Sequence, residues 1–182
     1  MWETKDPRPA KCIVGLLAAD DRCLKAAMEG LVETFGTVDL ASEVWPFDQT
    51  SYYQEEMGTT ILRQFASIGK LVDPGHLAAI KHRTNGLEQK LAQAMALPVR
   101  RPVNLDPGLI EPSKLVLATT KNYSHRIYIG DRIYAEVTLI FDKGRWQPLP
   151  YTYPDYRQAC YQEFFSRIRA RLVEQIRSLE SP

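Results

Sequence analysis

The sequence predicts an α+β protein, and three observations point to this class. Apolar runs of strand length occur in the first half of the chain, beginning with Cys12–Ala19. Other segments repeat apolar residues every three or four positions, as amphipathic helices do, and the last of these runs from Asp155 to about Leu179. A third region, Ser124–Phe141, is rich in β-branched and aromatic residues around Gly130-Asp131, which is typical of a β-hairpin. The length of 182 residues and the apolar content of 45% suit a single domain.

The order of elements in residues 12–106 predicts a ferredoxin-like core, the split βαβ plan. Asp20 or Asp21 is placed to cap the first helix, and Gly36 to end it. An extended arm, 1–11, precedes this core, because it carries two prolines and several charges. The expected strands are 12–19, 37–47, 59–71 and 103–106, and the expected helices are 21–35 and 77–95.

Residues 107–182 are expected to extend the core by a β-hairpin and a C-terminal amphipathic helix. In the hairpin, glycine at the first central position of Gly130-Asp131 suits a type II′ turn, and the resulting register places His125 opposite Glu136. Asp106-Pro107-Gly108 is expected to break the preceding strand in a turn. Residues 112–121 are interpreted as a short helix entered through proline, although their apolar residues would also suit a strand.

Composition and motifs narrow the function mainly by exclusion. The formal net charge of +1 gives no bulk electrostatic reason to expect nucleic acid, although it does not exclude it. The chain lacks the sequence motifs of P-loop NTPases, Rossmann oxidoreductases and zincins, and its three cysteines form no CxxC pair. No metal site is indicated, and no particular cofactor. Without a signal-peptide pattern or an apolar run of membrane length, a cytoplasmic protein with no membrane contact is expected.

The region 100–141 holds most of the side chains that could carry chemistry. His125 and Glu136 are predicted to meet, and a carboxylate orients an imidazole for general acid/base catalysis. The same pair could simply hold the hairpin in register. Asp106 is the third candidate catalytic residue, with closure of its own turn as the alternative.

The candidate ligand-binding residues of this region supply positive charge and hydrogen bonds: Arg101, Asn104, Lys114, Lys121, Ser124 and Arg126. They predict binding of an anionic small molecule, such as a nucleotide or a phosphorylated metabolite, with or without a reaction on it. One difficulty is that the predicted register puts Arg126 opposite Ala135, on the other face of the sheet from His125.

A second class of function is a non-catalytic assembly module that binds RNA or protein. The predicted surface for it consists of Tyr52, Tyr53 and the arginine-bearing face of the last helix, with Arg167 and Arg171. The aromatic run before that helix also makes a homodimer plausible. Glu55 and Glu56, in the loop after Tyr53, could lean over a pocket or belong to an ordinary connection.

Two long stretches, VNLDPGLIEPSKLVLATTKNYSHRIYIGDRIYAEVTLIF and PLPYTYPDYRQACYQEFF, resemble the bacterial domain-of-unknown-function 4416 family. The segments LVDPGHLAAIKHRTNGLEQKLA and YYQEEMG agree with it, so the resemblance covers nearly the whole chain. It implies a cytoplasmic, single-domain protein. It implies no activity, cofactor or catalytic residue, so function has to be argued from the residues themselves.

Overall fold

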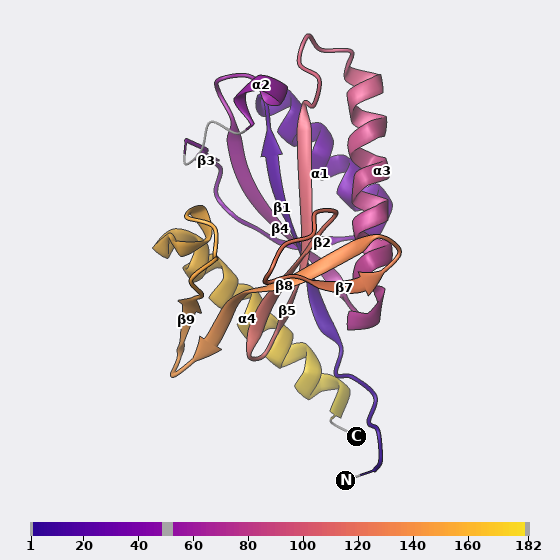
Figure 1. The fold of residues 1–182 in the computed structure, drawn as a ribbon, viewed down its shortest axis with the longest axis vertical. Helices are drawn as coiled ribbons and strands as arrows, with labels where there is room; N and C mark the ends of the chain where they lie inside the picture. The colour runs from indigo at the N-terminus through magenta and orange to yellow at the C-terminus, as the bar shows by residue number, and fades with distance from the viewer. Residues whose placement is uncertain (1, 49–52, 181–182) are drawn as a thin grey trace.

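The computed structural model describes residues 2–48 and 53–180 and confirms a fold that mixes α-helices and β-strands (Figure 1). Within these residues, nine strands form one antiparallel sheet, accompanied by four α-helices. The strands are β1 Ala10–Ala18, β2 Val38–Ala41, β3 Trp45–Pro46, β4 Leu62–Val72, β5 Val103–Glu111, β6 Lys114–Thr119, β7 Ile127–Gly130, β8 Ile133–Asp142 and β9 Arg145–Pro148. The helices are α1 Asp21–Phe35, α2 Gln54–Met57, α3 Leu77–Met95 and α4 Ala159–Glu180. None of the described helices combines the length and the apolar character needed to cross a bilayer.

The sheet has the strand order β2-β4-β1-β5-β6-β8-β7, with β3 paired to β4 and β9 paired to β8. The central strand β1 is buried along its whole length, as its continuous apolar sequence predicts. Helices α1 and α3 pack on one face of the sheet, and α4 packs on the other (Figure 1). Because side chains alternate along a strand, β1 contributes to both cores.

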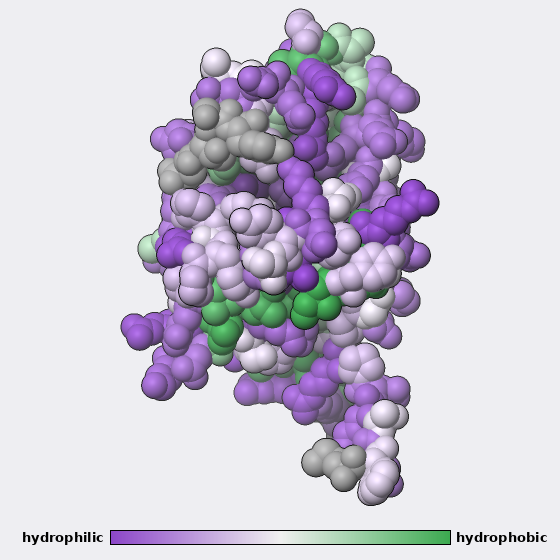
Figure 2. All heavy atoms as spheres, viewed as in Figure 1, coloured by the Kyte–Doolittle hydropathy of each residue, from purple (hydrophilic) through white to green (hydrophobic). Residues whose placement is uncertain are grey.

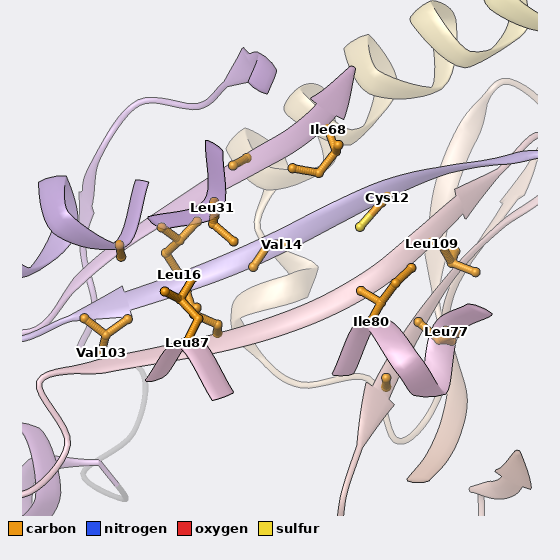
Figure 3. Close-up of a cluster of buried hydrophobic side chains, with 14 of the residues drawn as sticks. Cys12, Val14, Leu16, Leu31, Ile68, Leu77, Ile80, Leu87, Val103 and Leu109 are labelled. Atoms are coloured by element: carbon orange, nitrogen blue, oxygen red, sulfur yellow. The ribbon is translucent and has the colours of Figure 1, made fainter. Parts of the chain in front are cut away.

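The first core lies between the sheet and the α1–α3 pair. Cys12, Val14 and Leu16 of β1 pack there with Leu31 of α1 and Leu87 of α3 (Figure 3). The cap that starts α1 is the predicted one, since the Asp20 side chain accepts a hydrogen bond from the Cys23 N–H at 2.8 Å. The apolar spacing of the two helices marks most of their buried faces correctly, although Val32 of α1 is 45% exposed.

The second core is aromatic and lies under α4. Phe65 of β4 has its ring centroid 4.9 Å from that of Tyr161 and 5.0 Å from that of Phe165. Such edge-to-face ring pairs add about 0.5–1.5 kcal/mol beyond the area they bury. Leu179, at the end of the amphipathic pattern of this helix, is 68% exposed.

The predicted turn at Asp106-Pro107-Gly108 is wrong, because β5 continues through it from Val103 to Glu111. Pro107 is tolerated because pairing of β5 with β6 begins only at Gly108, so its missing N–H faces an edge without a strand. Gly108 is required by close approach: a Cβ there would lie 2.5 Å from the Val116 carbonyl oxygen.

The helix predicted for residues 112–121 is also wrong. Residues 112–113 form the turn of a hairpin, and β6 follows at Lys114–Thr119. Leu115 and Leu117 pack toward α4, whereas Val116 packs toward α3. Both faces of this strand are covered, so its sequence shows no period-two alternation that would have distinguished it from a buried helix.

The β7–β8 hairpin exists, but its predicted register is wrong by one residue. Ile127 pairs with Ala135 and Tyr128 with Tyr134, whereas the prediction paired Ile127 with Tyr134. The turn is centred on Asp131 and Arg132, which both have positive φ, as a type I′ turn requires. The turn lies one residue later than predicted, which moves the pairing by two positions. The irregularity of the β7 ladder between Tyr128 and Gly130 takes one of these back, so the net difference is one residue.

Candidate functional site

A cavity of about 740 Å³ lies where β5 and β6 separate. Along residues 103–107, β5 pairs with β1 on one side, and β6 pairing on the other side has not yet begun. The face of the molecule seen in Figure 2 is mostly hydrophilic, with a band of hydrophobic side chains across its middle. The cavity is lined by Phe47, Tyr53, Arg63, Lys81, Asn85, Glu88, Gln89, Arg101, Asn104, Asp106, Leu117, Ala118, Thr119, Thr120, Lys121, Arg126, Glu136, Tyr153, Pro154, Asp155 and Tyr156.

One wall of the cavity is built by polar side chains of α3 that bond to the open edge of β5. Lys81 Nζ donates to the Leu105 carbonyl oxygen at 3.0 Å, and the Leu105 N–H donates to Glu88 Oε1 at 2.7 Å. Arg101 Nη2 donates to the other Glu88 oxygen at 2.8 Å. Helix side chains thus satisfy backbone groups that a neighbouring strand would otherwise satisfy.

A second wall contains Arg63, a buried cation that is only 3% exposed. Its Nη2 donates to Asp155 Oδ2 at 2.8 Å. The guanidinium carbon lies 4.9 Å from the ring centroid of Phe47 and 5.9 Å from that of Tyr156. Among the described residues, Arg63 Nε and Nη1 make no hydrogen bond, and both atoms are buried. Buried donors almost always make a hydrogen bond, so two unpaired donors on one guanidinium are an unusual feature of this wall.

Gly15 makes room for this guanidinium. It pairs with Phe65 on β4 and with Asp106 on β5, so it lies between the strands that carry Arg63 and Asp106. A Cβ at Gly15 would lie 3.0 Å from Arg63 Nη1 and 3.3 Å from the Tyr156 hydroxyl oxygen. The missing side chain lets the guanidinium lie across β1.

Asp106 is a carboxylate surrounded by cations at the floor of the cavity. Its Oδ1 lies 3.4 Å from Lys81 Nζ, its Oδ2 accepts from Asn104 Nδ2 at 2.6 Å, and its side chain is 30% exposed. Burial alone would raise the pKa of Asp106, but Lys81, Arg63, the Asn104 hydrogen bond and Arg101 together lower it. An anion at this position is therefore stabilised by its surroundings.

The third wall is closed by Arg126, which joins two loops and a strand. Its Nε donates to Glu136 Oε2 at 2.8 Å, its Nη1 to the Lys121 carbonyl oxygen at 3.0 Å, and its Nη2 to the Tyr153 hydroxyl at 2.7 Å. Burial lowers the pKa of Arg126, but the Glu136 and Tyr153 contacts outweigh it and the pKa is raised. The guanidinium stays charged and ties the rim together.

His125 meets Glu136, with 3.2 Å between Nε2 and Oε2, although the register that predicted the contact was wrong. Arg126 and His125 both reach this carboxylate, contrary to the expected placement on opposite faces, because both residues precede β7 and are not held by its alternation. The imidazole stacks on Tyr151, with ring centroids 4.1 Å apart. His125 is not among the residues lining the cavity, and it touches that lining through Glu136.

A family model described as "Domain of unknown function (DUF4416)" matches residues 8–172. The chain belongs to the DUF4416 family. The resemblance noted in the sequence is therefore confirmed over nearly the whole chain. No curated protein and no solved structure matches this DUF4416 chain. Membership brings no activity with it, so a function for this protein has to be inferred from the geometry of the cavity.

The cavity of this DUF4416 protein gathers six of the nine candidate residues predicted from sequence: Arg101, Asn104, Asp106, Lys121, Arg126 and Glu136. Lys114 does not line it and instead pairs with Glu111 at 2.8 Å on the β5–β6 hairpin. Ser124 is exposed and, like His125, lies outside the lining. The catalytic and binding roles suggested for these residues stay predictions.

Sequence reasoning missed the residues that reach the cavity from other parts of the chain, including Arg63, Lys81, Glu88 and Asp155. The sequence does contain a signal for Arg63. It lies two residues from both Ile61 and Phe65, so it shares their buried face of the strand. Lys81 and Glu88 lie seven residues apart and so share a face of α3. Nothing in the local pattern indicates that Asp155 pairs with Arg63, which is 92 positions away.

The residues singled out in the sequence outside the region 100–141 lie in several different places. Tyr52 lies outside the described residues, whereas Tyr53 lines the cavity. Glu56 lies 3.7 Å from Arg101, so it faces the rim. On α4, Arg171 lies within ion-pair distance of Asp39 and Glu174. The part of the chain that the structure describes contains no cluster of His, Cys, Asp or Glu suited to holding a metal ion.

Proposed function

We propose that this DUF4416 protein binds an anionic small molecule in the cavity between β5 and β6. The observation that carries the proposal is the buried guanidinium of Arg63, whose Nε and Nη1 have no acceptor among the described residues. Leaving a buried donor unsatisfied costs about 1–3 kcal/mol, and more when the group is charged. Because both nitrogens are enclosed, an anion in the cavity would offset part of this cost through its negative charge rather than through direct hydrogen bonds.

The charges that line the cavity also favour a negatively charged ligand. Its lining contains five cationic side chains, Arg63, Lys81, Arg101, Lys121 and Arg126, and four carboxylates, Glu88, Asp106, Glu136 and Asp155. Each carboxylate has a cationic neighbour within 3.4 Å. The pairs neutralise one another, and the surplus of one positive charge favours a ligand with net negative charge.

The size of the cavity supports a small molecule rather than a polymer. Its volume of about 740 Å³ falls within the range of roughly 300–1,000 Å³ found for ligand pockets. Phe47, Tyr53 and Tyr156 add aromatic surface to the polar lining. If a reaction occurs, the ionised Asp106 has direct access to the ligand, whereas His125 would act through Glu136.

The test is thermal stabilisation of the purified protein by inorganic phosphate, citrate, AMP and GMP. A ligand present at 100 times its Kd stabilises the folded state by about 2.7 kcal/mol, which corresponds to a Tm increase of about 5–10 °C for a chain of this size. Lys121→Gln, on the cavity lining, should weaken the shift. Lys25→Gln, on the exposed face of α1, is the matched control and should leave it unchanged.

The proposal fails if no anion raises the Tm of the wild-type protein at millimolar concentration. It also fails if the stabilisation is the same in Arg63→Gln, provided that this variant keeps its circular dichroism spectrum. Retention on RNA that is lost in Arg167→Glu/Arg171→Glu, with no response to small anions, would support the assembly-module alternative instead.

We also infer that residues 12–106 form a ferredoxin-like unit. The support is the order β2-β4-β1-β5, antiparallel throughout, with α1 and α3 packed on the same face. Strands β6–β9 and helix α4 would then be additions that create the second core and the cavity.

A further inference from the structure

Asp106 has unused capacity to accept hydrogen bonds inside the cavity. A carboxylate offers about four acceptor positions, two on each oxygen. Lys81 Nζ approaches Oδ1 and Asn104 Nδ2 donates to Oδ2, which leaves one position on each oxygen. Because the Asp106 side chain is 30% exposed and lines the cavity, these positions are open to a ligand. Two N–H groups side by side would fill both.

Arg63 has unused capacity of the opposite kind. Its Nε and Nη1 lack acceptors among the described residues, and Nη1 lies over Gly15, the residue that pairs with Asp106. Asp106 helps to raise the pKa of Arg63, and Arg63 helps to lower the pKa of Asp106. Both unpaired nitrogens are enclosed, so Arg63 adds positive charge beside the Asp106 acceptors rather than an open donor.

We infer that the anion bound here carries a 2-amino-4-oxopyrimidine ring edge, whose two adjacent N–H groups donate to Asp106 beside the buried charge of Arg63. Guanine nucleotides and pterins share this edge. The inference rests on the proposed function and narrows the ligand from any small anion to one chemical class. Adenine and cytosine offer a different order of donors and acceptors and match this floor less well.

The rest of the cavity suits the ring and its charged substituent. Tyr153 is 46% exposed and lines the cavity, so part of its side chain is accessible for stacking against a planar ring. Arg126 holds the Tyr153 hydroxyl at 2.7 Å and fixes the side chain at the rim. Lys121 and Arg101 line the same cavity and could approach a phosphate or carboxylate attached to the heterocycle.

Isothermal titration calorimetry of the wild-type protein tests the inference with GMP, pterin-6-carboxylate, IMP, AMP and inorganic phosphate. GMP or pterin-6-carboxylate should bind about 10- to 100-fold more tightly than AMP, which is the discrimination expected of one good bidentate contact. IMP, which lacks the 2-amino group, should fall between them. Tight binding of only one of the first two probes would identify which source of the ring edge the protein uses.

Asp106→Asn provides the second measurement, because an amide accepts on one atom only. It should reduce the affinity for GMP or pterin-6-carboxylate to the level of AMP and leave the affinity for AMP unchanged. Tyr153→Ala should weaken all ring-containing probes by about tenfold and leave phosphate unaffected. The comparison of probes on the wild-type protein needs neither variant. It therefore tests the inference even if a variant fails to fold.

Two results separate the failures. If the wild-type protein binds GMP, pterin-6-carboxylate, AMP and phosphate with equal affinity, the inference about the ring edge is overturned and the proposed anion site stands. If none of these probes binds and no anion raises the Tm of the wild-type protein, the proposed function itself falls.

Discussion

Replacing Arg63 by methionine should destabilise the protein by about 3–5 kcal/mol, the usual cost of leaving one partner of a buried ion pair uncompensated. Arg63 Nη2 and Asp155 Oδ2 are 2.8 Å apart, and the two side chains are only 4% and 7% exposed. Without the guanidinium, the Asp155 carboxylate has lost its cation in a low-dielectric setting. The double variant Arg63→Met/Asp155→Asn removes both charges and should recover most of the loss.

Urea unfolding followed by circular dichroism measures the free energy of unfolding of the wild-type protein, both single variants and the double variant. Lys25→Met is the control, because its pair with Glu29 is highly exposed and such pairs contribute about 0–1 kcal/mol. The cycle gives the coupling between Arg63 and Asp155 directly. A double variant that is as unstable as the sum of the two single variants would refute the reasoning.

The loss of unfolding free energy in Arg63→Met should also depend on pH. Burial raises the pKa of Asp155 above its ordinary value, although Arg63 opposes this. Without Arg63 the pKa rises further, so the folded variant holds a proton at pH values where the unfolded chain has lost it. That stabilisation is lost as the pH rises from the unfolded pKa of about 3.9 through the folded pKa. The deficit of Arg63→Met should therefore be larger near pH 8 than near pH 5, and a constant deficit would contradict this account.

Two further predictions concern packing and thiol reactivity. Gly108→Ala should destabilise the protein by about 1–3 kcal/mol in urea unfolding, because its Cβ would press on the Val116 carbonyl; Gly86→Ala, which meets no atom within 4 Å in α3, should instead stabilise by about 0.5–1 kcal/mol. Burial raises the pKa of the Cys12 thiol to about 12, so it should resist a thiol reagent near pH 8 until the protein unfolds, whereas the half-buried Cys160 should react in the native state. Rapid native labelling of Cys12 would show that the first core opens readily.

Much of the fold could be predicted where the signal is local. The cap at Asp20, the apolar faces of α1 and α3 and the run of aromatic residues on α4 all follow from spacing within one element. The prediction failed at β6, because a strand covered on both faces has the same apolar pattern as a buried helix. It failed at β5 because Pro107 is acceptable only at an edge that the neighbouring strand does not reach, and this depends on long-range pairing.

The candidate site was predictable only in part for the same reason. Residues between Arg101 and Glu136 gather because they lie on consecutive strands, and the density of polar side chains there indicated them. Arg63, two of whose nitrogens make no hydrogen bond, comes from β4. Its partner Asp155 comes from the segment before α4. Only the sheet order brings these distant segments to one cavity.

The polar face of α3 divides into two kinds of position. Lys81 and Glu88 hold the backbone of β5, so a change at either would disturb the sheet. Asn85 and Gln89 lie between and beside them on the same helix and also line the cavity. On the proposed function, exchanging these two amides would change which ligand is recognised without removing the contacts that hold β5.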